Sequence, residues 1–263
     1  MTTLSLALTD SATMLRRNLR HALRYPALTL SVAGLPVVFL LLFVYVLGGT
    51  LGDGIGGGSG GRTTYVNYVV PGILMIALAA SPTGTAISVA MDMTEGIIAR
   101  FRTMAIARVS VLTGHVVGSL IQTTIGLAVV TGVALLVGFR PTATPLEWVA
   151  VTAFMVMITF ALTWLAVALG LVAPNPEAAS NIPLPLTFLP FLGSGFVPTE
   201  SMPAVLRAFA EWQPFTPFTE TVRGLLMGTP IGDSAAVSVA WCAGIWLVGY
   251  LWARKLYNRD PVR

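Results

Sequence analysis

Long apolar runs alternate with short polar segments along this chain of 263 residues. A helix that crosses a membrane needs about 20 apolar residues in succession. Six runs meet or approach that length, and we predict that each forms a membrane span. They comprise residues 28–47, 66–90, 109–137, 146–172, 182–197 and 237–252. The fifth run is short and contains Pro183, Pro185 and Pro190, which we expect to interrupt its backbone hydrogen bonds.

Three further segments have the spacing of amphipathic helices. Residues 11–26 place apolar side chains on one side and arginines around the other, as in a helix that lies in the membrane interface. In residues 95–108, "EGIIARFRTMAIAR", the apolar positions share one helical face, which predicts a helix joining two spans; a basic loop that serves topology alone is the alternative. Residues 198–227 predict two short helices that dip into the outer interface, with an ordinary extracellular loop as the alternative.

The basic residues are unevenly distributed, and their distribution predicts the orientation. Eleven of the 15 lysines and arginines lie in the N-terminal tail, in residues 95–108 and in the C-terminal tail. Cytoplasmic segments of membrane proteins are enriched in lysine and arginine. We therefore predict that both termini and residues 95–108 face the cytoplasm. The formal net charge of +4 then reflects topology, which disfavours a nucleic acid as partner.

The composition also favours a membrane protein. Hydrophobic residues make up 55% of the chain and charged residues 10%, whereas soluble domains carry about 25% charged residues. Cys242 is the one cysteine, so an intramolecular disulfide is excluded. The N-terminal arginines precede an apolar run that is too long for a cleavable signal peptide. The prediction is an all-α protein of the plasma membrane with six transmembrane helices.

Few polar groups within the predicted spans could take part in catalysis. His115 lies in the third span between Gly114 and Gly118, where close helix packing is the first interpretation and a functional role is the alternative. No carboxylate lies in the middle of a predicted span, which argues against a proton-driven carrier. The glycine-rich residues 48–62 lack the Gly-Lys-Ser/Thr ending of a phosphate loop. We therefore expect no enzyme, metal or cofactor in this chain, and its energy would come from another polypeptide.

Three stretches of the sequence resemble one family of transporters. They are "YVNYVVPGIL", "GIIARFRTMAIARVSVLTGH" and "GFVPTESMPAVLRAFAEWQPFTPFTETVRGLLMG". Together with the six predicted spans they cover most of the chain, which resembles the permease subunit of ABC type-2 exporters in the daunorubicin-resistance-like branch. Ala105 stands where this family often has proline, and Ala99 stands where relatives are often acidic. We expect a local change in helix shape at the first and the loss of one contact at the second.

The resemblance implies one transmembrane domain over residues 1–263 and two kinds of protein partner. Two permease subunits, as a homodimer in preference to a heterodimer, would work with two cytoplasmic ABC ATPase subunits that hold ATP and Mg²⁺. Residues 95–108 would be the coupling helix that the ATPase moves, residues 11–26 a connecting helix beside the ATPase, and residues 198–227 a re-entrant helix pair. The coupling residues would be Glu95, Ile98, Arg100, Phe101, Arg102, Met104 and Arg108.

The resemblance also implies alternating access at the interface between the two permeases, along the first, second and fifth spans. The residues predicted to line this path are Asn67, Met75, Phe188, Phe191, Leu192 and Phe196. Their apolar and aromatic side chains suit an amphipathic or hydrophobic cargo such as a drug, a natural product or a lipid-like molecule. For the phenylalanines, packing against lipid or core is the alternative. For the whole chain, the alternative is a non-pumping membrane scaffold or receptor subunit that recruits a cytoplasmic partner.

Overall fold

The protein is described by a computed structural model over residues 26–55, 61–95 and 108–257. Within these residues every regular element is helical, which confirms the all-α class. The elements are α2 (Pro26–Leu42), the π-helical turn η1 (Phe43–Leu47), α3 (Gly48–Ile55), α4 (Gly61–Thr94), α6 (Arg108–Val137), α7 (Pro145–Val172), α8 (Pro176–Asn181), α9 (Leu184–Phe188), the 3-10 turns η2 (Leu189–Leu192) and η3 (Thr199–Ser201), α10 (Ala204–Trp212), α11 (Phe215–Met227) and α12 (Ser234–Tyr257).

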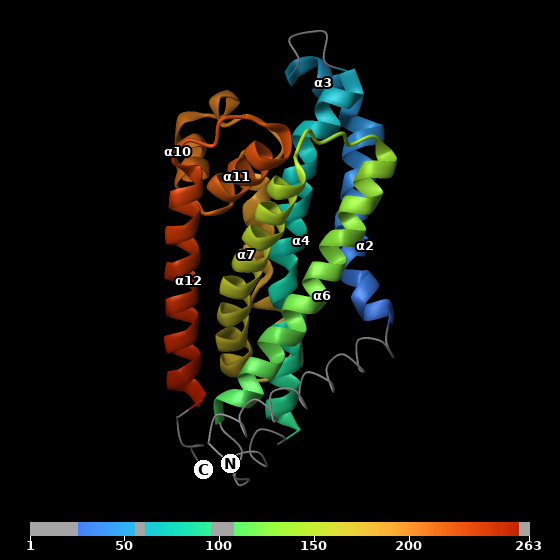
Figure 1. The fold of residues 1–263 in the computed structure, drawn as a ribbon. Helices are drawn as coiled ribbons and strands as arrows, with labels where there is room; N and C mark the ends of the chain where they lie inside the picture. The colour runs from blue at the N-terminus through green and yellow to red at the C-terminus, as the bar shows by residue number, and fades with distance from the viewer. Residues whose placement is uncertain (1–25, 56–60, 96–107, 258–263) are drawn as a thin grey trace.

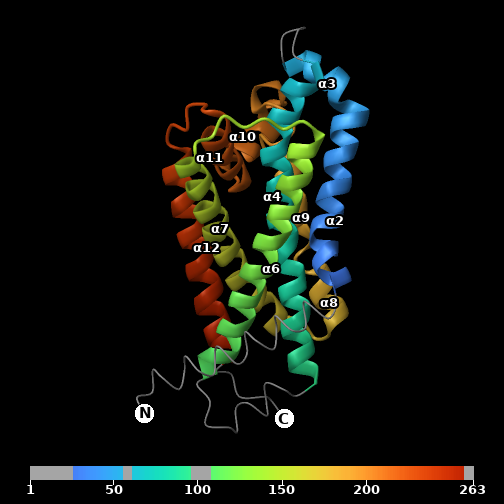
Figure 2. The same ribbon diagram turned by 45° about the vertical axis from the view of Figure 1, so that its right-hand side comes forward.

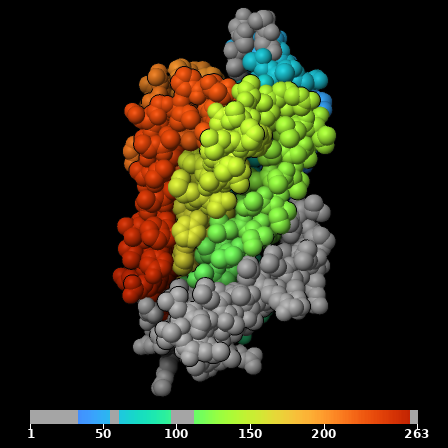
Figure 3. Space-filling model, in the orientation of Figure 1, coloured from blue at the N-terminus to red at the C-terminus, as the bar shows by residue number. Residues whose placement is uncertain are grey.

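Five helices are long and apolar enough to cross a membrane, and they stand side by side in a bundle (Figure 1). They comprise Ala33–Gly54, Gly61–Thr94, Leu112–Val137, Pro145–Val172 and Ser234–Tyr257. Helix α4 is the centre of the bundle, because 72% of its most apolar window is buried, compared with 17% for α12. It packs against α2, α6, α7 and α11. In contrast to α4, the helices α6, α7 and α12 form the outer surface on the face that Figure 3 shows.

The segment predicted as the fifth span is not a continuous helix. It is divided into α9 and η2 and then continues as turns, with α8 just before it. Its prolines explain the division, since each lacks a backbone N–H and prevents the regular hydrogen bonding of an α-helix. We refer to residues 176–196 as the broken segment. Five long helices are present in the described residues, so the count of six spans stays a prediction.

The broken segment nevertheless runs along most of the length of α4. Ala179 lies in a small cluster with residues near the C-terminal end of that helix. Further along, Thr187 Oγ1 donates to the Ala79 carbonyl at 3.4 Å. Near the N-terminal end of α4 the backbones of Gly72 and Gly195 touch, because a Cβ on Gly72 would stand 2.6 Å from the Gly195 oxygen. The segment therefore passes from the end of the molecule that holds α8 to the end that holds α10 (Figure 2).

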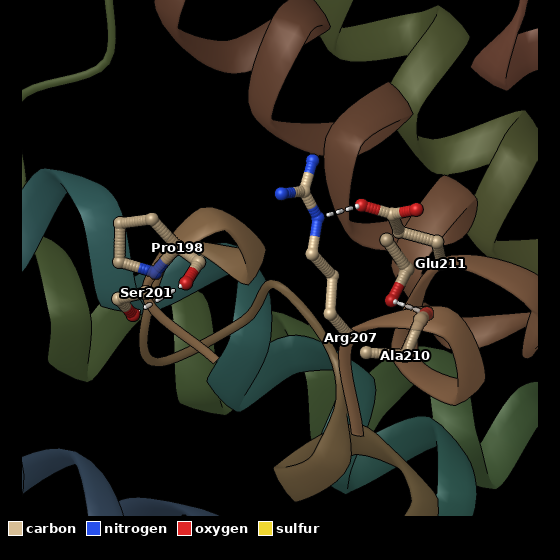
Figure 4. A network of polar contacts seen from close by, with 6 residues as sticks. Pro198, Ser201, Arg207, Ala210 and Glu211 are labelled. Carbon is tan, nitrogen blue, oxygen red and sulfur yellow. Dashed lines mark hydrogen bonds and ion pairs between the residues drawn. The ribbon is translucent and has the colours of Figure 1, made fainter. Parts of the chain in front are cut away.

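Two short helices follow the broken segment at that end of the bundle (Figure 1). Helix α10 leaves Val205 and Trp212 largely exposed, at 87% and 71%, although both are apolar. On its polar side Arg207 Nε donates to Glu211 Oε1 at 2.7 Å (Figure 4). Helix α11 is instead mostly buried and packs against α4, α7 and α12. The two helices predicted within residues 198–227 are present; their position relative to a membrane stays a prediction.

Local sequence sets the ends of several helices. Thr144 and Glu147 form a capping box at the start of α7, with a proline as its first residue. Asn175 caps α8 by accepting a hydrogen bond from the Ala178 N–H at 2.7 Å. Gly228, with a φ of 69°, ends α11 in the left-handed region that glycine adopts without strain. These local interactions set where α7 and α8 begin and where α11 ends.

Candidate functional site

The predicted coupling helix lies largely outside the described residues. Five of its seven predicted contact residues fall there: Ile98, Arg100, Phe101, Arg102 and Met104. Its two ends are described, because Glu95 N–H donates to the Met91 carbonyl at 2.9 Å and Arg108 begins α6. The C-terminal end of α4 and the N-terminal end of α6 lie at the same end of the bundle (Figure 1). The intervening segment thus connects two neighbouring helices at one end of the molecule.

Two of the predicted path residues meet in an aromatic cluster. The rings of Phe191 and Phe196 stack with centroids 5.2 Å apart and an angle of 13° between their planes. Phe43 from η1 stacks on Phe196 at 4.8 Å, and Phe39 from α2 meets Phe191 edge-on at 5.3 Å. We call these four residues the phenylalanine cluster. It joins the first long helix to the broken segment. That these residues line a transport path stays a prediction.

The other four predicted path residues are placed differently. Phe188 and Leu192 lie on the broken segment with 61% and 38% of their surface exposed. Met75 is completely buried in the main core, so it lines no open surface in this conformation. Asn67 Oδ1 accepts a hydrogen bond from the Arg140 backbone N–H at 3.0 Å. Asn67 therefore holds the connection between α6 and α7, a role that the sequence did not indicate.

Arg223 joins three parts of the molecule near α10. Its Nη2 donates to the Ser194 carbonyl at 2.7 Å and to the Tyr68 carbonyl at 3.3 Å. Its guanidinium carbon lies 4.0 Å from the centroid of the Tyr68 ring, and the Tyr68 hydroxyl also donates to the Ser194 carbonyl at 3.0 Å. Burial lowers the pKa of the Arg223 guanidinium from its ordinary value. Helix α11 is thus tied to α4 and to the broken segment.

The role of Arg223 was not predicted from the sequence, where it is one of the four basic residues that lie outside the N-terminal tail, residues 95–108 and the C-terminal tail. Among the described residues it forms no ion pair with a carboxylate. Carbonyl oxygens and the face of an aromatic ring stabilise its charge instead. The available signal was an arginine on a short helix that also carries Phe215, Phe218, Val222 and Leu226, because a charge on a helix that is mostly buried needs partners inside the protein.

A second set of polar contacts lies between α4, α6 and α7. His115 Nε2 lies 2.9 Å from Asp92 Oδ2, with only 7% and 10% of the two side chains exposed. Two turns before Asp92 on α4, Thr85 Oγ1 donates to Ser119 Oγ at 2.8 Å. Ser119 Oγ lies 3.4 Å from Thr163 Oγ1 on α7. We call these five residues the polar seam.

The Asp92–His115 contact corrects one boundary of the sequence analysis. The predicted second span ended at residue 90, which left Asp92 outside it. In the structure α4 continues to Thr94, and the Asp92 side chain is buried against α6. His115, interpreted as a packing residue, does pack there, but with a carboxylate as its partner. The hydrophobic pattern of a sequence locates a helix well but its last turn poorly. For this reason the sequence did not predict the contact between Asp92 and His115.

These observations define an integral membrane protein in which long apolar helices are joined by buried polar contacts. The chain belongs to the ABC-2 type transporter family, whose model matches residues 10–227. It is 27% identical over 244 residues to the "Daunorubicin resistance ABC transporter permease protein DrrB1" of Streptomyces coeruleorubidus, with 92% of this chain and 79% of the relative covered. It is 26% identical over 220 residues to the "Probable doxorubicin resistance ABC transporter permease protein DrrC" of Mycobacterium tuberculosis, with 81% and 75% covered.

The comparisons confirm the resemblance found in the sequence, and the chain is an ABC-2 permease subunit. Family membership implies association with an ABC ATPase and with a permease partner. In this family the ATPase is generally a separate subunit and the permease is non-catalytic. Residues 10–227 include the predicted coupling segment, the broken segment and the helices α10 and α11.

Proposed function

We propose that this permease exports an amphipathic or hydrophobic molecule by alternating access at the interface between two permease subunits. The phenylalanine cluster is the observation that supports this proposal most. It brings aromatic faces from α2 and η1 together with faces from the broken segment, two parts of the chain about 150 residues apart. Phe196 itself is buried, so the partly exposed rings of Phe39, Phe43 and Phe191 would present the aromatic surface to a planar or apolar cargo, without requiring a charge in the path.

The broken segment suits a transport path for a second physical reason. In a lipid environment, irregular backbone is tolerated only where it is buried in protein or lines a water-filled cavity. Its turns around Gly195 lie against Gly72 of α4, while Phe188 exposes 61% of its surface. One side is therefore held by protein and the other is open. We infer that a second permease subunit, a copy of this chain, faces the open side.

Two ATPase subunits on the cytoplasmic side would supply the energy. ATP binding would close them against the coupling helix at residues 95–108, and the permeases would then close inside and open outside. The relatives are named for resistance to daunorubicin and doxorubicin, so amphipathic drug-like molecules of that kind are the first cargoes to test.

The proposal can be tested with purified permease and its partner ATPase in proteoliposomes. Phe101→Asp and Arg102→Glu alter the predicted coupling face, whereas the control Arg207→Ala alters an exposed arginine of α10 at the opposite end. We expect the first two variants to lose substrate-stimulated ATP turnover and transport, and the control to keep both. Unchanged turnover and transport in Phe101→Asp and Arg102→Glu would reject the coupling assignment. Recruitment of a partner by the wild type without any transport would favour a scaffold.

A further inference from the structure

The two helices that leave the coupling segment are joined close to it by a buried polar pair. Asp92 lies two residues before the end of α4, and His115 lies seven residues after the start of α6. With the carboxylate as acceptor, His115 Nε2 donates across the 2.9 Å between the two side chains. Both side chains are at least nine-tenths buried. The pair therefore joins α4 to α6 close to the predicted coupling segment, residues 95–108, and lies outside it.

Such a pair is unusual in a chain this apolar. Ionisable side chains buried in membrane helices are costly, and removing one partner takes a hydrogen bond away from the other. An apolar contact would join α4 and α6 at a lower desolvation cost. The hydrophobic effect has no preferred direction, however, whereas a hydrogen bond between two buried side chains has a preferred distance and direction. The hydrogen bond between Asp92 and His115 thus favours one fixed position of α4 relative to α6.

The remaining members of the polar seam extend this connection into the bundle. His115 and Ser119 are four residues apart on α6, and Asp92 and Thr85 are seven apart on α4, so each pair shares one face of its helix. The Asp92–His115 and Thr85–Ser119 contacts therefore join the same face of α4 to the same face of α6, at two successive positions along the helices. Through the 3.4 Å approach of Ser119 Oγ to Thr163 Oγ1, the seam also reaches α7.

We propose that Asp92 and His115 are positioning residues that make α4 and α6 move as one unit when the ATPase displaces the coupling segment. A segment held at two ends transmits a push only if those ends keep their relative position; otherwise it pivots and the motion is lost. The proposal rests on the proposed function, because it concerns how that function is coupled to ATP. It predicts uncoupling, in which ATP is consumed and less cargo moves per ATP.

The test measures transport per ATP hydrolysed in proteoliposomes that contain the permease and its ATPase. We expect Asp92→Ala and His115→Ala to keep ATP turnover within about twofold of the wild type while transport per ATP falls about tenfold, the effect of losing one buried charged hydrogen bond on an equilibrium. Asp92→Asn, which can still accept from His115, and the exchange of Asp92→His with His115→Asp should recover most of the coupling. Ser119→Ala should give a smaller loss.

Thr124→Val is the matched control on α6, since the Thr124 hydroxyl donates to Leu120 of its own helix at 2.7 Å. It should leave transport per ATP unchanged. A wild type that shows no ATP-dependent transport would reject the proposed function, and this inference with it. A transporting wild type whose Asp92→Ala and His115→Ala variants keep the same transport per ATP would reject the inference alone. The inference would also be rejected if ATP turnover and transport in Asp92→Ala and His115→Ala fell together, in proportion to the amount of folded protein, and Asp92→Asn showed no recovery.

Discussion

Arg223 and Arg207 show how differently two arginines can be held at the same end of this molecule. Arg207 is exposed on α10, and its ion pair with Glu211 raises the pKa of its guanidinium (Figure 4). Exposed pairs of this kind contribute little stability, because water solvates both charges when they separate. Arg223 is largely buried and relies on two carbonyl oxygens and the ring of Tyr68. Its contacts cannot be replaced by water without opening the end of the bundle.

The first prediction concerns this difference. Arg223→Ala should lower the free energy of unfolding by about 2 kcal/mol, because it removes charged hydrogen bonds and a cation–π contact. Arg207→Ala should leave it unchanged within error. Thermal unfolding of both variants in detergent would compare them. Equal stability of the two variants would show that the contacts of Arg223 add nothing to the fold.

Phe196 and Phe188 provide a second comparison at the same scale. Phe196 is 6% exposed and stacks between two other rings, whereas Phe188 is 61% exposed. Phe196→Ala should cost about 3–5 kcal/mol through lost burial and the cavity left behind. Phe188→Ala should leave stability nearly unchanged and reduce cargo affinity if the open side lines the path. Thermal unfolding and the KM for transport would separate the two effects; equal stability loss in both variants would contradict the packing.

Sequence reasoning reached some of these residues and missed others for identifiable reasons. It selected Phe191 and Phe196 because aromatic side chains in a predicted span suit an apolar cargo, but Phe39 and Phe43 became visible only once α2 lay beside the broken segment. It noted His115 without Asp92. Periodicity along a helix reports which face is buried, and it carries no information on which other helix covers that face.

At the scale of elements, hydrophobic run lengths predicted the long helices well. The predicted spans 66–90, 109–137 and 146–172 correspond to α4, α6 and α7, with the largest error at the ends of α4. The prolines correctly indicated that the fifth run would be interrupted. They could not show that the interrupted segment follows α4, because that depends on two glycines whose backbones meet across a distance of more than 120 residues in the sequence.

The third prediction tests this contact between elements. Gly72→Ala places a Cβ 2.6 Å from the Gly195 oxygen, so the broken segment must move away from α4. We expect a loss of about 1–3 kcal/mol, as for other overpacked sites. Gly84→Ala on the same helix is the control, because a Cβ there meets no atom within 4 Å and alanine favours a helix more than glycine does. Equal unfolding temperatures for the two variants would contradict the close approach.

At the scale of the whole molecule, the described helices imply a direction for the chain. Helix α2 begins at the end of the bundle where α12 finishes, and α10 and α11 lie at the opposite end (Figures 1 and 2). Basic residues of the last turn of α12, Arg254 and Lys255, lie at the first end. Because positive charge accumulates on the cytoplasmic side, we expect this end to face the cytoplasm and α10 to face outward.

The last prediction tests that orientation with single cysteines in a Cys242→Ala background. Arg207→Cys on α10 and Lys255→Cys on α12 are matched, since both replace basic residues on exposed positions at opposite ends. In intact cells a membrane-impermeant maleimide should label the first and not the second; after permeabilisation it should label both. The physical reason is that the reagent cannot cross the bilayer to reach a thiol on the cytoplasmic side. Labelling of Lys255→Cys alone in intact cells would invert the topology, and with it the side on which the ATPase could meet the segment between α4 and α6.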